Sequence, residues 1–268
     1  MFINKDTKKT FIIAEVGNNH EGNISVAKKL INLASKAGVD AIKFQTFITE
    51  KFINKDNKKR FNQLKRFELS FKQFKILKDL ANKKKLKFVS TPLDLKSANF
   101  LIKNSDIIKV ASSDNNFFPL LDIILKSKKK VIISTGMTSI KNILNLISYI
   151  SKKIGTKKMI ERISLLHCVT SYPVDDKYVN LNSIAFLKEK TNLTIGYSDH
   201  SLGFEACMGA VVLGAQIVEK HFTIDKNFSD FRDHKLSADF YEMKKIVDSI
   251  RKIELQLGKF NKTVLPVE

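Results

Sequence analysis

The sequence contains no tryptophan and few cysteine, proline or glycine residues. Its 268 residues include two Cys, four Pro and ten Gly. The cysteines, Cys168 and Cys207, lie in apolar surroundings, which excludes a disulfide-stapled fold and is typical of core thiols in a reducing cytoplasm. No Pro- or Gly-rich linker and no internal repeat divides the chain. We therefore expect one globular domain, long enough to bury a large core.

Long apolar runs are also missing. The longest, Ala206–Val218, is shorter than the roughly 20 residues that cross a membrane and contains Gln216. The first residues, Met1–Lys9, have no apolar h-region, so we expect no secretory signal. These observations predict a cytoplasmic protein without a membrane partner.

Acidic residues are scarce relative to basic ones. The chain has 47 Lys and Arg against 27 Asp and Glu, a formal charge of +20. Such a charge is one mark of nucleic-acid binding, but the lysines are scattered over every predicted helix and no nucleic-acid motif accompanies them. We interpret them as solvated surface lysines and expect no nucleic-acid partner. The excess charge would still attract an anionic substrate.

Eight short β-branched runs alternate with segments whose apolar residues have helical spacing. They are Phe11–Gly17, Asp40–Thr46, Lys87–Pro92, Ile107–Ser112, Lys130–Gly136, Ile163–Val169, Thr194–Asp199 and Ile217–Thr223. This alternation predicts a parallel sheet, and eight units predict an α/β fold of the closed (β/α)8 TIM barrel type in a single domain. The alternative is a doubly wound open sheet, but Gly17–Gly22 is not the glycine-rich loop that usually follows its first strand.

The boundaries of the other segments follow from local signals. Ser70, Ser139 and Ser237 are predicted to cap helices. The polar stretch Lys51–Leu69 is interpreted as an extended loop. We expect residues 1–257 to form the barrel and residues 258–268 to form a C-terminal tail.

Polar side chains gather at the carboxyl ends of the predicted strands, where the active sites of such barrels lie. They are Glu15, Lys43, Gln45, Thr91, Lys109, Ser112, Asp114, Ser134, Ser198, His200, Glu219 and His221, and Asp233 follows in the loop after the last strand. We predict that this rim is the functional site.

Lys43 and Lys109 stand in otherwise apolar strands, where an unpaired lysine would be costly. They could form structural salt bridges with inward carboxylates such as Glu15 or Glu219. They could instead grip a phosphate or carboxylate, with hydroxyl groups and the backbone around Gly136 completing an anion cradle. A Schiff-base lysine is the third alternative.

His200 and His221 each close a short apolar run in neighbouring units. Two imidazoles at one rim could hold a divalent metal and leave coordination positions open for substrate. The alternative is a pair of core histidines bonded to the backbone. Their joint position beside Asp199 and Glu219 favours the metal. Weaker candidates are His20 and His167, as neighbours of the ligands, and His234, as a substrate contact.

In order and spacing, eight motifs resemble the N-acetylneuraminate (sialic acid) synthase family over about residues 10–240. The motifs are Ala14–Gly22, Gly38–Thr46, Ser90–Pro92, Lys109–Ser112, Ser134–Met137, Leu166–Cys168 with Tyr172-Pro173, Gly196–His200 and Glu219–Thr223. The resemblance implies a barrel that condenses phosphoenolpyruvate with an open-chain N-acetylated amino sugar similar to N-acetylmannosamine. The implied products are a sialic-type nonulosonic acid and phosphate.

The resemblance also implies a role for each matching residue. His200 and His221 would hold Mn²⁺ or Mg²⁺, and Glu15 would be the catalytic carboxylate. Lys43 and Lys109 would bind phosphoenolpyruvate with help from Thr91, Ser112 and Ser134. Ser198, at the end of its strand, is a further substrate-binding candidate. Gln45, Asp114 and Asp233 would face the sugar. Many members of the family form a homodimer in which a small antifreeze-like C-terminal domain of one subunit reaches the sugar site of the other. This sequence ends where that domain would begin, and Ala111 and Thr170 stand where the family has Gly and Asn.

Two further functions compete with the synthase. One is a Schiff-base aldolase or lyase that uses Lys43 or Lys109. The other is a barrel that binds a sugar or a partner protein and has lost turnover.

Overall fold

A computed structural model describes residues 9–259 and 261–268. Residues 1–8 and Phe260 lie outside these described residues. The prediction that Met1–Lys9 is no secretory signal and part of the predicted tail therefore fall on residues that are not described. Within the described ranges, no helix is long and apolar enough to span a bilayer.

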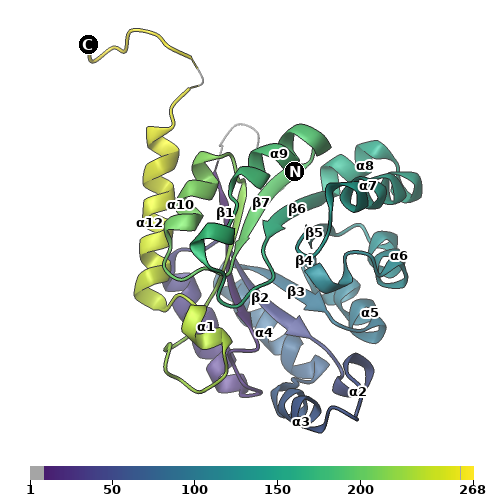
Figure 1. Cartoon of the computed structure of the whole chain (residues 1–268). Coiled ribbons are helices and arrows are strands. Elements are labelled where there is room, and N and C mark those ends of the chain that lie inside the picture. Colours follow the sequence, from purple (N-terminus) through teal and green to yellow (C-terminus); the bar gives the residue numbers. More distant parts are fainter. Residues whose placement is uncertain (1–8, 260) are drawn as a thin grey trace.

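Eight parallel strands close into a barrel in the order of the chain, from β1 next to β2 round to β8 next to β1 (Figure 1). The strands are β1 (Phe11–Gly17), β2 (Ala41–Thr46), β3 (Lys87–Pro92), β4 (Ile107–Val110), β5 (Lys130–Ser134), β6 (Ile163–Cys168), β7 (Thr194–Asp199) and β8 (Ile217–His221). The predicted (β/α)8 barrel is therefore confirmed. The predicted bounds agree for β1, β3 and β7 and differ by one or two residues elsewhere, as strand ends commonly do.

Helices cover the outside of the barrel, and short helices follow some of the strand ends. They are α1 (Ile24–Ala37), α2 (Thr49–Phe52), α3 (Lys58–Phe67), α4 (Phe71–Lys83), α5 (Leu95–Asn104), α6 (Phe118–Lys126), α7 (Ile140–Ile154), α8 (Thr156–Arg162), α9 (Asn182–Thr191), α10 (Glu205–Val212), α11 (Asp233–Leu236) and α12 (Phe240–Gln256), with 3₁₀ turns η1 (Ser112–Asp114) and η2 (Asp176–Tyr178). After α12 the described residues form no further helix or strand (Figure 1). The division at residue 257 stays a prediction.

The predicted loop Lys51–Leu69 is wrong, because most of it is helical. Helix α3 begins after Asn57, whose side chain accepts a hydrogen bond from the Arg60 amide at 3.3 Å. Leu64 and Phe67 are buried on its inner face. Phe67 packs edge-on against Phe231, with ring centroids 5.1 Å apart. The apolar partner that stabilises this polar helix is thus far away in sequence.

Two of the three predicted helix caps are correct. The hydroxyl groups of Ser70 and Ser139 accept hydrogen bonds from the first turns of α4 and α7. Ser237 does not cap α12. The cap of α12 is Asp239, which exchanges hydrogen bonds with Glu242 in a capping box. Two residues earlier, Ser237 ends the short helix α11 instead.

An apolar layer fills the barrel interior below the strand ends. It consists of Ile13, Ala41, Val89, Ile107, Ile132, Leu166 and Ile217, with Phe11 packed against it. Because side chains alternate across a strand, the residue two positions after each of these points into the same interior. Those positions hold Glu15, Lys43, Thr91, Lys109, Ser134, Cys168 and Glu219. The polar layer therefore rests directly on an apolar floor.

Gly196 holds the corresponding floor position on β7. A Cβ atom there would lie 2.5 Å from the Ile217 carbonyl oxygen and 2.6 Å from the Leu166 side chain. The interior has no room for a side chain at this point. The glycine thus lets β7 approach its neighbours closely and brings Ser198, two residues later, to the rim.

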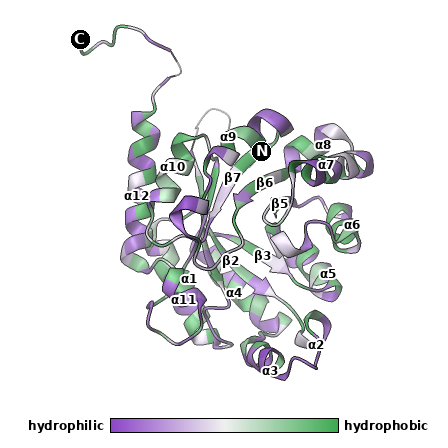
Figure 2. Ribbon diagram, viewed as in Figure 1, coloured by the Kyte–Doolittle hydropathy of each residue, from purple (hydrophilic) through white to green (hydrophobic). Residues whose placement is uncertain are grey.

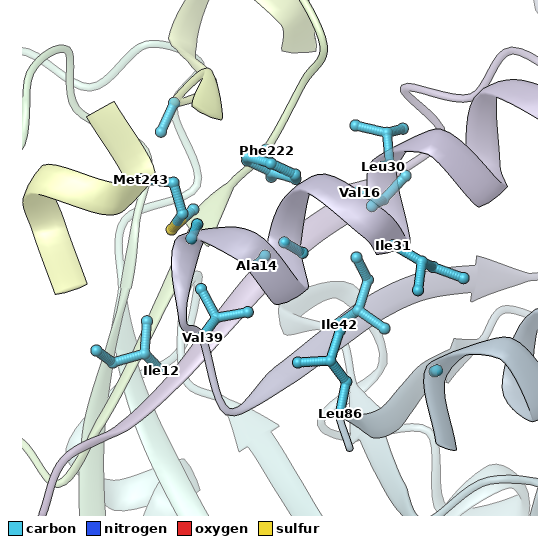
Figure 3. Packing of buried hydrophobic residues seen from close by; sticks show 14 of the residues in the cluster. Ile12, Ala14, Val16, Leu30, Ile31, Val39, Ile42, Leu86, Phe222 and Met243 are labelled. Atoms are coloured by element: carbon cyan, nitrogen blue, oxygen red, sulfur yellow. The ribbon is translucent and has the colours of Figure 1, made fainter. Parts of the chain in front are cut away.

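The outer face of the barrel buries the apolar stripes of the helices, and the surrounding helices carry green and purple faces in Figure 2. On one side, Ile12, Ala14 and Val16 of β1 pack against Leu30 and Ile31 of α1 (Figure 3). Each such buried aliphatic side chain contributes about 1.5–3 kcal/mol. This packing holds the strand ends, and so the rim, in fixed positions.

Candidate active site

A cavity of about 160 Å³ opens at the carboxyl ends of the strands. The residues that line it include most of those predicted from the sequence, namely Glu15, Lys43, Gln45, Thr91, Lys109, Ser112, Ser134, Ser198, His200, Glu219, His221 and Asp233. Asp114 does not line the cavity. It lies in η1 and its carboxylate accepts a hydrogen bond from the neighbouring Ser113 hydroxyl at 3.3 Å, so its predicted contact with the sugar stays a prediction.

Two lysines and two glutamates form a buried ionic cluster at the floor of the cavity. Lys43 Nζ lies 2.5 Å from Glu15 Oε2 and 3.5 Å from Glu219 Oε2. Lys109 Nζ lies 3.2 Å from Glu219 Oε1, which also accepts a hydrogen bond from the Ser198 hydroxyl at 2.9 Å. Glu219 therefore bridges both lysines. The salt-bridge partners considered from the sequence are the observed ones, and all four charged side chains face the cavity.

Burial and charge act differently on the two carboxyl groups. Burial raises the pKa of Glu15, and the nearby Lys43 offsets this only in part. Burial acts on Glu219 as well, but Lys109 and Lys43 outweigh it and lower the pKa of Glu219. At neutral pH Glu219 is thus ionised, and Glu15 is the carboxyl group that more readily holds a proton.

The two lysines also differ. Burial disfavours the charged form of Lys43, but Glu15 and Glu219 outweigh that effect and raise its pKa. For Lys109, burial dominates over the attraction of Glu219, and the pKa is lowered. Lys43 is therefore protonated at neutral pH, whereas Lys109 loses its proton more easily than an ordinary lysine does.

Hydroxyl groups and a close backbone turn border the lysines. Ser112 Oγ accepts a hydrogen bond from the Gly136 amide at 3.1 Å. A Cβ atom at Gly136 would lie 2.4 Å from Thr170 Oγ1 and 2.7 Å from Ser112 Oγ, so any side chain here would displace these two hydroxyl groups. Ser134 Oγ is buried and has no hydrogen-bond partner among the described residues. An unpaired buried hydroxyl facing a cavity is suited to a polar ligand.

His200 and His221 lie side by side at the rim, with ring centroids 5.5 Å apart. The strand pairing places His221 opposite Glu15. His200 Nδ1 lies 2.8 Å from the Val169 carbonyl oxygen, which must accept, so Nε2 carries the lone pair. His221 Nδ1 is buried and has no partner among the described residues. Burial lowers the pKa of His200 to about 4 and that of His221 well below its usual value, so both rings are neutral at pH 7.

A neutral, fixed imidazole with a free nitrogen is the form that binds a metal. The two histidines therefore fit a divalent cation. Between residues 9 and 259 and in the described tail, no group of three or more His, Cys, Asp or Glu side chains is arranged around a metal position. Oxygen atoms of water or substrate would have to complete the coordination.

The weaker histidine candidates and Asp199 form hydrogen bonds or ion pairs with other parts of the fold. His20 accepts a hydrogen bond from the Gly22 amide at 3.0 Å, and His167 is bonded to the Val179 carbonyl group at 2.8 Å. His234 contacts Thr223 at 2.7 Å and Glu21 at 3.3 Å. None of the three lines the cavity. Asp199 turns away from the histidines and pairs with Lys220 at 2.8 Å.

Several residues of the cavity have no place in the sequence prediction. Arg60 and Phe231 line its mouth together with Arg232, whose guanidinium group lies 4.9 Å from the centre of the Tyr172 ring. Arg60 was hidden in the stretch interpreted as a loop. The only sequence signal for Arg232 is its position beside Asp233, with which it pairs at 3.3 Å. These arginines add positive charge where an anion would enter.

Both cysteines are free and buried, as predicted. Cys168 lies at the cavity wall, with its sulfur 3.7 Å from Ser112 Oγ and 3.9 Å from His200 Nδ1. Burial raises the pKa of this thiol, so it is an unreactive neighbour of the site.

A TIM barrel with a buried lysine–glutamate cluster and paired neutral imidazoles at its carboxyl rim is the architecture of an enzyme that handles anionic substrates. Comparison with known proteins identifies the enzyme family. A profile of the NeuB family matches residues 30–262. The chain therefore belongs to the NeuB family, which confirms the resemblance seen in the sequence.

Individual relatives agree with this assignment. An uncharacterised protein of Methanocaldococcus jannaschii is 46% identical over 97% of this chain and 75% of its own length. The N,N'-diacetyllegionaminic acid synthase of Campylobacter jejuni is 40% identical over 94% of this chain and 78% of its own length.

A solved structure shows the same architecture. It is the N-acetylneuraminic acid synthetase of Leptospira borgpetersenii in complex with citrate, with a TM-score of 0.90 and 36% identity over 97% of this chain and 88% of that one. The prediction that this chain is an enzyme of the sialic-type acid synthase kind is confirmed by its family membership.

Proposed function

We propose that this enzyme condenses phosphoenolpyruvate with the open-chain aldehyde form of an N-acetylated amino sugar. Water is consumed, and the products are a nonulosonic acid and phosphate. The observation that carries the proposal is the buried cluster of Lys43, Lys109, Glu15 and Glu219 beside two neutral histidines. The names of the relatives support it, because two of them are synthases of such acids. They differ in their product, so the acceptor sugar is left to experiment.

The charges of the site suit phosphoenolpyruvate. Its phosphate carries close to two negative charges above about pH 6, and its carboxylate carries one more. Lys43 and Lys109 supply two positive charges and Glu219 one negative, while the raised pKa of Glu15 limits the second negative charge. A divalent cation and the arginines at the mouth would supply the remaining compensation. Ser112, Ser134 and Thr91 would donate hydrogen bonds to the phosphate and carboxylate oxygens.

We further propose that His200 and His221 hold the cation, as Mn²⁺ or Mg²⁺. Their neutral rings, the tautomer set by Val169 and the unpartnered Nδ1 of His221 support this assignment. When bound, the cation would act as a Lewis acid on the aldehyde oxygen.

In this scheme Glu15 handles the protons. The new bond joins C3 of phosphoenolpyruvate to the aldehyde carbon, and the aldehyde oxygen then needs a proton. Water adds to C2 and loses one proton. The C2–O bond to phosphate then breaks, the C2 hydroxyl becomes the keto group, and its proton leaves with the phosphate. Glu15 is suited to give the first proton and take up the second, because burial raises its pKa above that of an ordinary glutamate. Lys43, 2.5 Å away, would hold this carboxyl group in place.

The experiment is phosphate release from phosphoenolpyruvate with Mn²⁺, screened over N-acetylmannosamine and related 2-acetamido sugars. We expect release that requires the sugar and stops with a chelator, and the Glu15→Gln variant is the matched control. Phosphate release that is equally fast without any sugar would contradict the proposal. Binding of both substrates without release would favour a barrel that only binds sugar.

A Schiff-base aldolase is the second candidate, since the lowered pKa of Lys109 favours a neutral amine. Treatment with pyruvate and borohydride separates the two functions. A covalent adduct on Lys109 would support the aldolase, whereas the synthase should form none.

A further inference from the structure

A second buried ion pair lies on the outer face of the barrel, behind the two histidines. Lys220 Nζ is 2.8 Å from Asp199 Oδ2, and these side chains are only 2% and 0% exposed. Neither residue lines the cavity. Both belong to the sequence motifs that contain His200 and His221, yet the proposed reaction assigns them no role.

The strand alternation explains where this pair lies. On β7 and β8, Ser198 and Glu219 face the cavity, and so do His200 and His221. The residues between them must point the opposite way. Asp199 there meets Cys207 of α10, whose sulfur lies 3.3 Å from Asp199 Oδ2. Asp199 and Lys220 also form the last register pair between the two strands.

The hydrogen bonds of this pair hold the chain on both sides of His200. Lys220 Nζ donates to Asp199 Oδ2 at 2.8 Å and to the Ser201 carbonyl oxygen at 2.6 Å. Asp199 Oδ1 accepts from the Ser201 amide at 2.9 Å, and from the hydroxyl groups of Ser201 at 2.6 Å and Tyr197 at 2.9 Å. Lys220 itself immediately precedes His221. The ammonium group of Lys220, the residue before His221, thus binds Asp199 and Ser201, the residues on either side of His200.

We propose that Asp199 and Lys220 are positioning residues that fix His200 and His221 relative to each other and so set the metal affinity of the site. The inference rests on the proposed metal site. Its physical basis is that a buried ion pair adds little net stability compared with apolar side chains of similar size. Its directed hydrogen bonds, in contrast, fix one arrangement of the two strand ends. Partners behind metal-binding histidines commonly change metal affinity by about 10–100-fold.

The test separates positioning from stability. Lys220→Met alone leaves a buried unpaired carboxylate and should destabilise the fold. The double variant Asp199→Leu/Lys220→Met replaces the pair with apolar groups and should recover most of that stability. Ile150→Ala is the control, because Ile150 is a buried residue of α7, a helix that contributes no residue to the lining of the cavity.

Three readouts of the site are needed. Mn²⁺ affinity is measured by electron paramagnetic resonance of the free ion, beside the affinity for phosphoenolpyruvate without metal. The tautomer of His200 is read without metal from the ring ¹⁵N shifts of histidine-labelled protein. In the double variant we expect Mn²⁺ binding about 10–100-fold weaker, phosphoenolpyruvate binding nearly unchanged, and partial loss of the Nδ1–H form that donates to Val169. Ile150→Ala should change none of these.

Recovery of both stability and Mn²⁺ affinity in the double variant, with an unchanged tautomer, would overturn the inference. The pair would then be a structural contact only. If the original protein binds no Mn²⁺ but the tautomer still shifts in the double variant, the metal proposal fails and the positioning role stands. If the original protein binds no Mn²⁺ and the tautomer does not shift in the double variant, both the metal proposal and the positioning role are wrong.

Discussion

Replacing Glu219 with glutamine should lower the free energy of unfolding by about 3 kcal/mol, whereas the same change at Glu15 should leave it nearly unaltered. Both glutamates are buried, but Glu15 pairs only with Lys43, whereas Glu219 pairs with Lys43 and Lys109. The pKa of Glu219 falls from 4.5 to about 2 because Lys109 and Lys43 outweigh burial. At about 1.4 kcal/mol per pKa unit, this drop corresponds to about 3 kcal/mol. The figure agrees with the ~3–5 kcal/mol lost when one partner of a buried ion pair is removed.

The pH dependence of the two variants has opposite signs. The pKa of Glu219 is lowered by folding, so its stabilisation is fully present above about pH 4.5 and is lost as the pH falls toward 2. The pKa of Glu15 is raised by folding, because burial outweighs Lys43. The original protein should therefore lose stability relative to Glu15→Gln as the pH rises from 4.5 through the folded-state pKa. At pH 7.5 the Glu15 variant should be at least as stable as the original.

Urea unfolding at pH 7.5, followed by far-ultraviolet circular dichroism because the chain has no tryptophan, measures both variants. The unfolding midpoint should fall for Glu219→Gln with an unchanged urea dependence. A loss of stability at Glu15→Gln as large as that at Glu219→Gln would refute the reasoning, since Glu15 would then be ionised and stabilising in the fold.

Three further predictions concern the site. Glu15→Gln should reduce kcat by about 10²–10⁴-fold while phosphoenolpyruvate still binds; near-normal turnover in the phosphate assay would remove Glu15 from the chemistry. His221→Ala should weaken Mn²⁺ binding measured by titration, and unchanged metal content would contradict the two-histidine site. Gly136→Ala should raise the KM for phosphoenolpyruvate without unfolding the protein, because its Cβ would come within 2.7 Å of Ser112 Oγ and 2.4 Å of Thr170 Oγ1; an unchanged KM would show that this turn lies outside the anion site.

Much of the fold could be predicted because its signals are local. The β-branched runs of β1, β3 and β7 gave strand bounds that agree with the structure. The helix α3 could not be predicted in this way. It buries only Leu64 and Phe67, and their partner Phe231 follows more than 160 residues later. A polar helix that depends on such a distant contact looks like a loop in the sequence.

The candidate site divides in the same manner. Strand ends located the polar layer, and family motifs gave each residue an expected role. The sequence could not show that Arg60 reaches the cavity mouth or that Asp114 does not. It ranked His20, His167 and His234 below the two histidines of the rim, but it could not show which hydrogen bonds hold them within the fold. Those distinctions depend on the direction of loops.

By itself, the sequence determined the eight-unit barrel and the side-chain alternation that puts Glu15 on the same face of its strand as the apolar Ile13. Side-chain alternation along each strand is a local property, so no contact between strands is needed to see it. Only the tertiary structure decided which charges meet. Lys109 and Glu219, 110 residues apart, pair because barrel closure brings β4 and β8 to face each other across the interior. The opposite protonation tendencies of Glu15 and Glu219 follow from that closure, because burial and the distances to the two lysines set them.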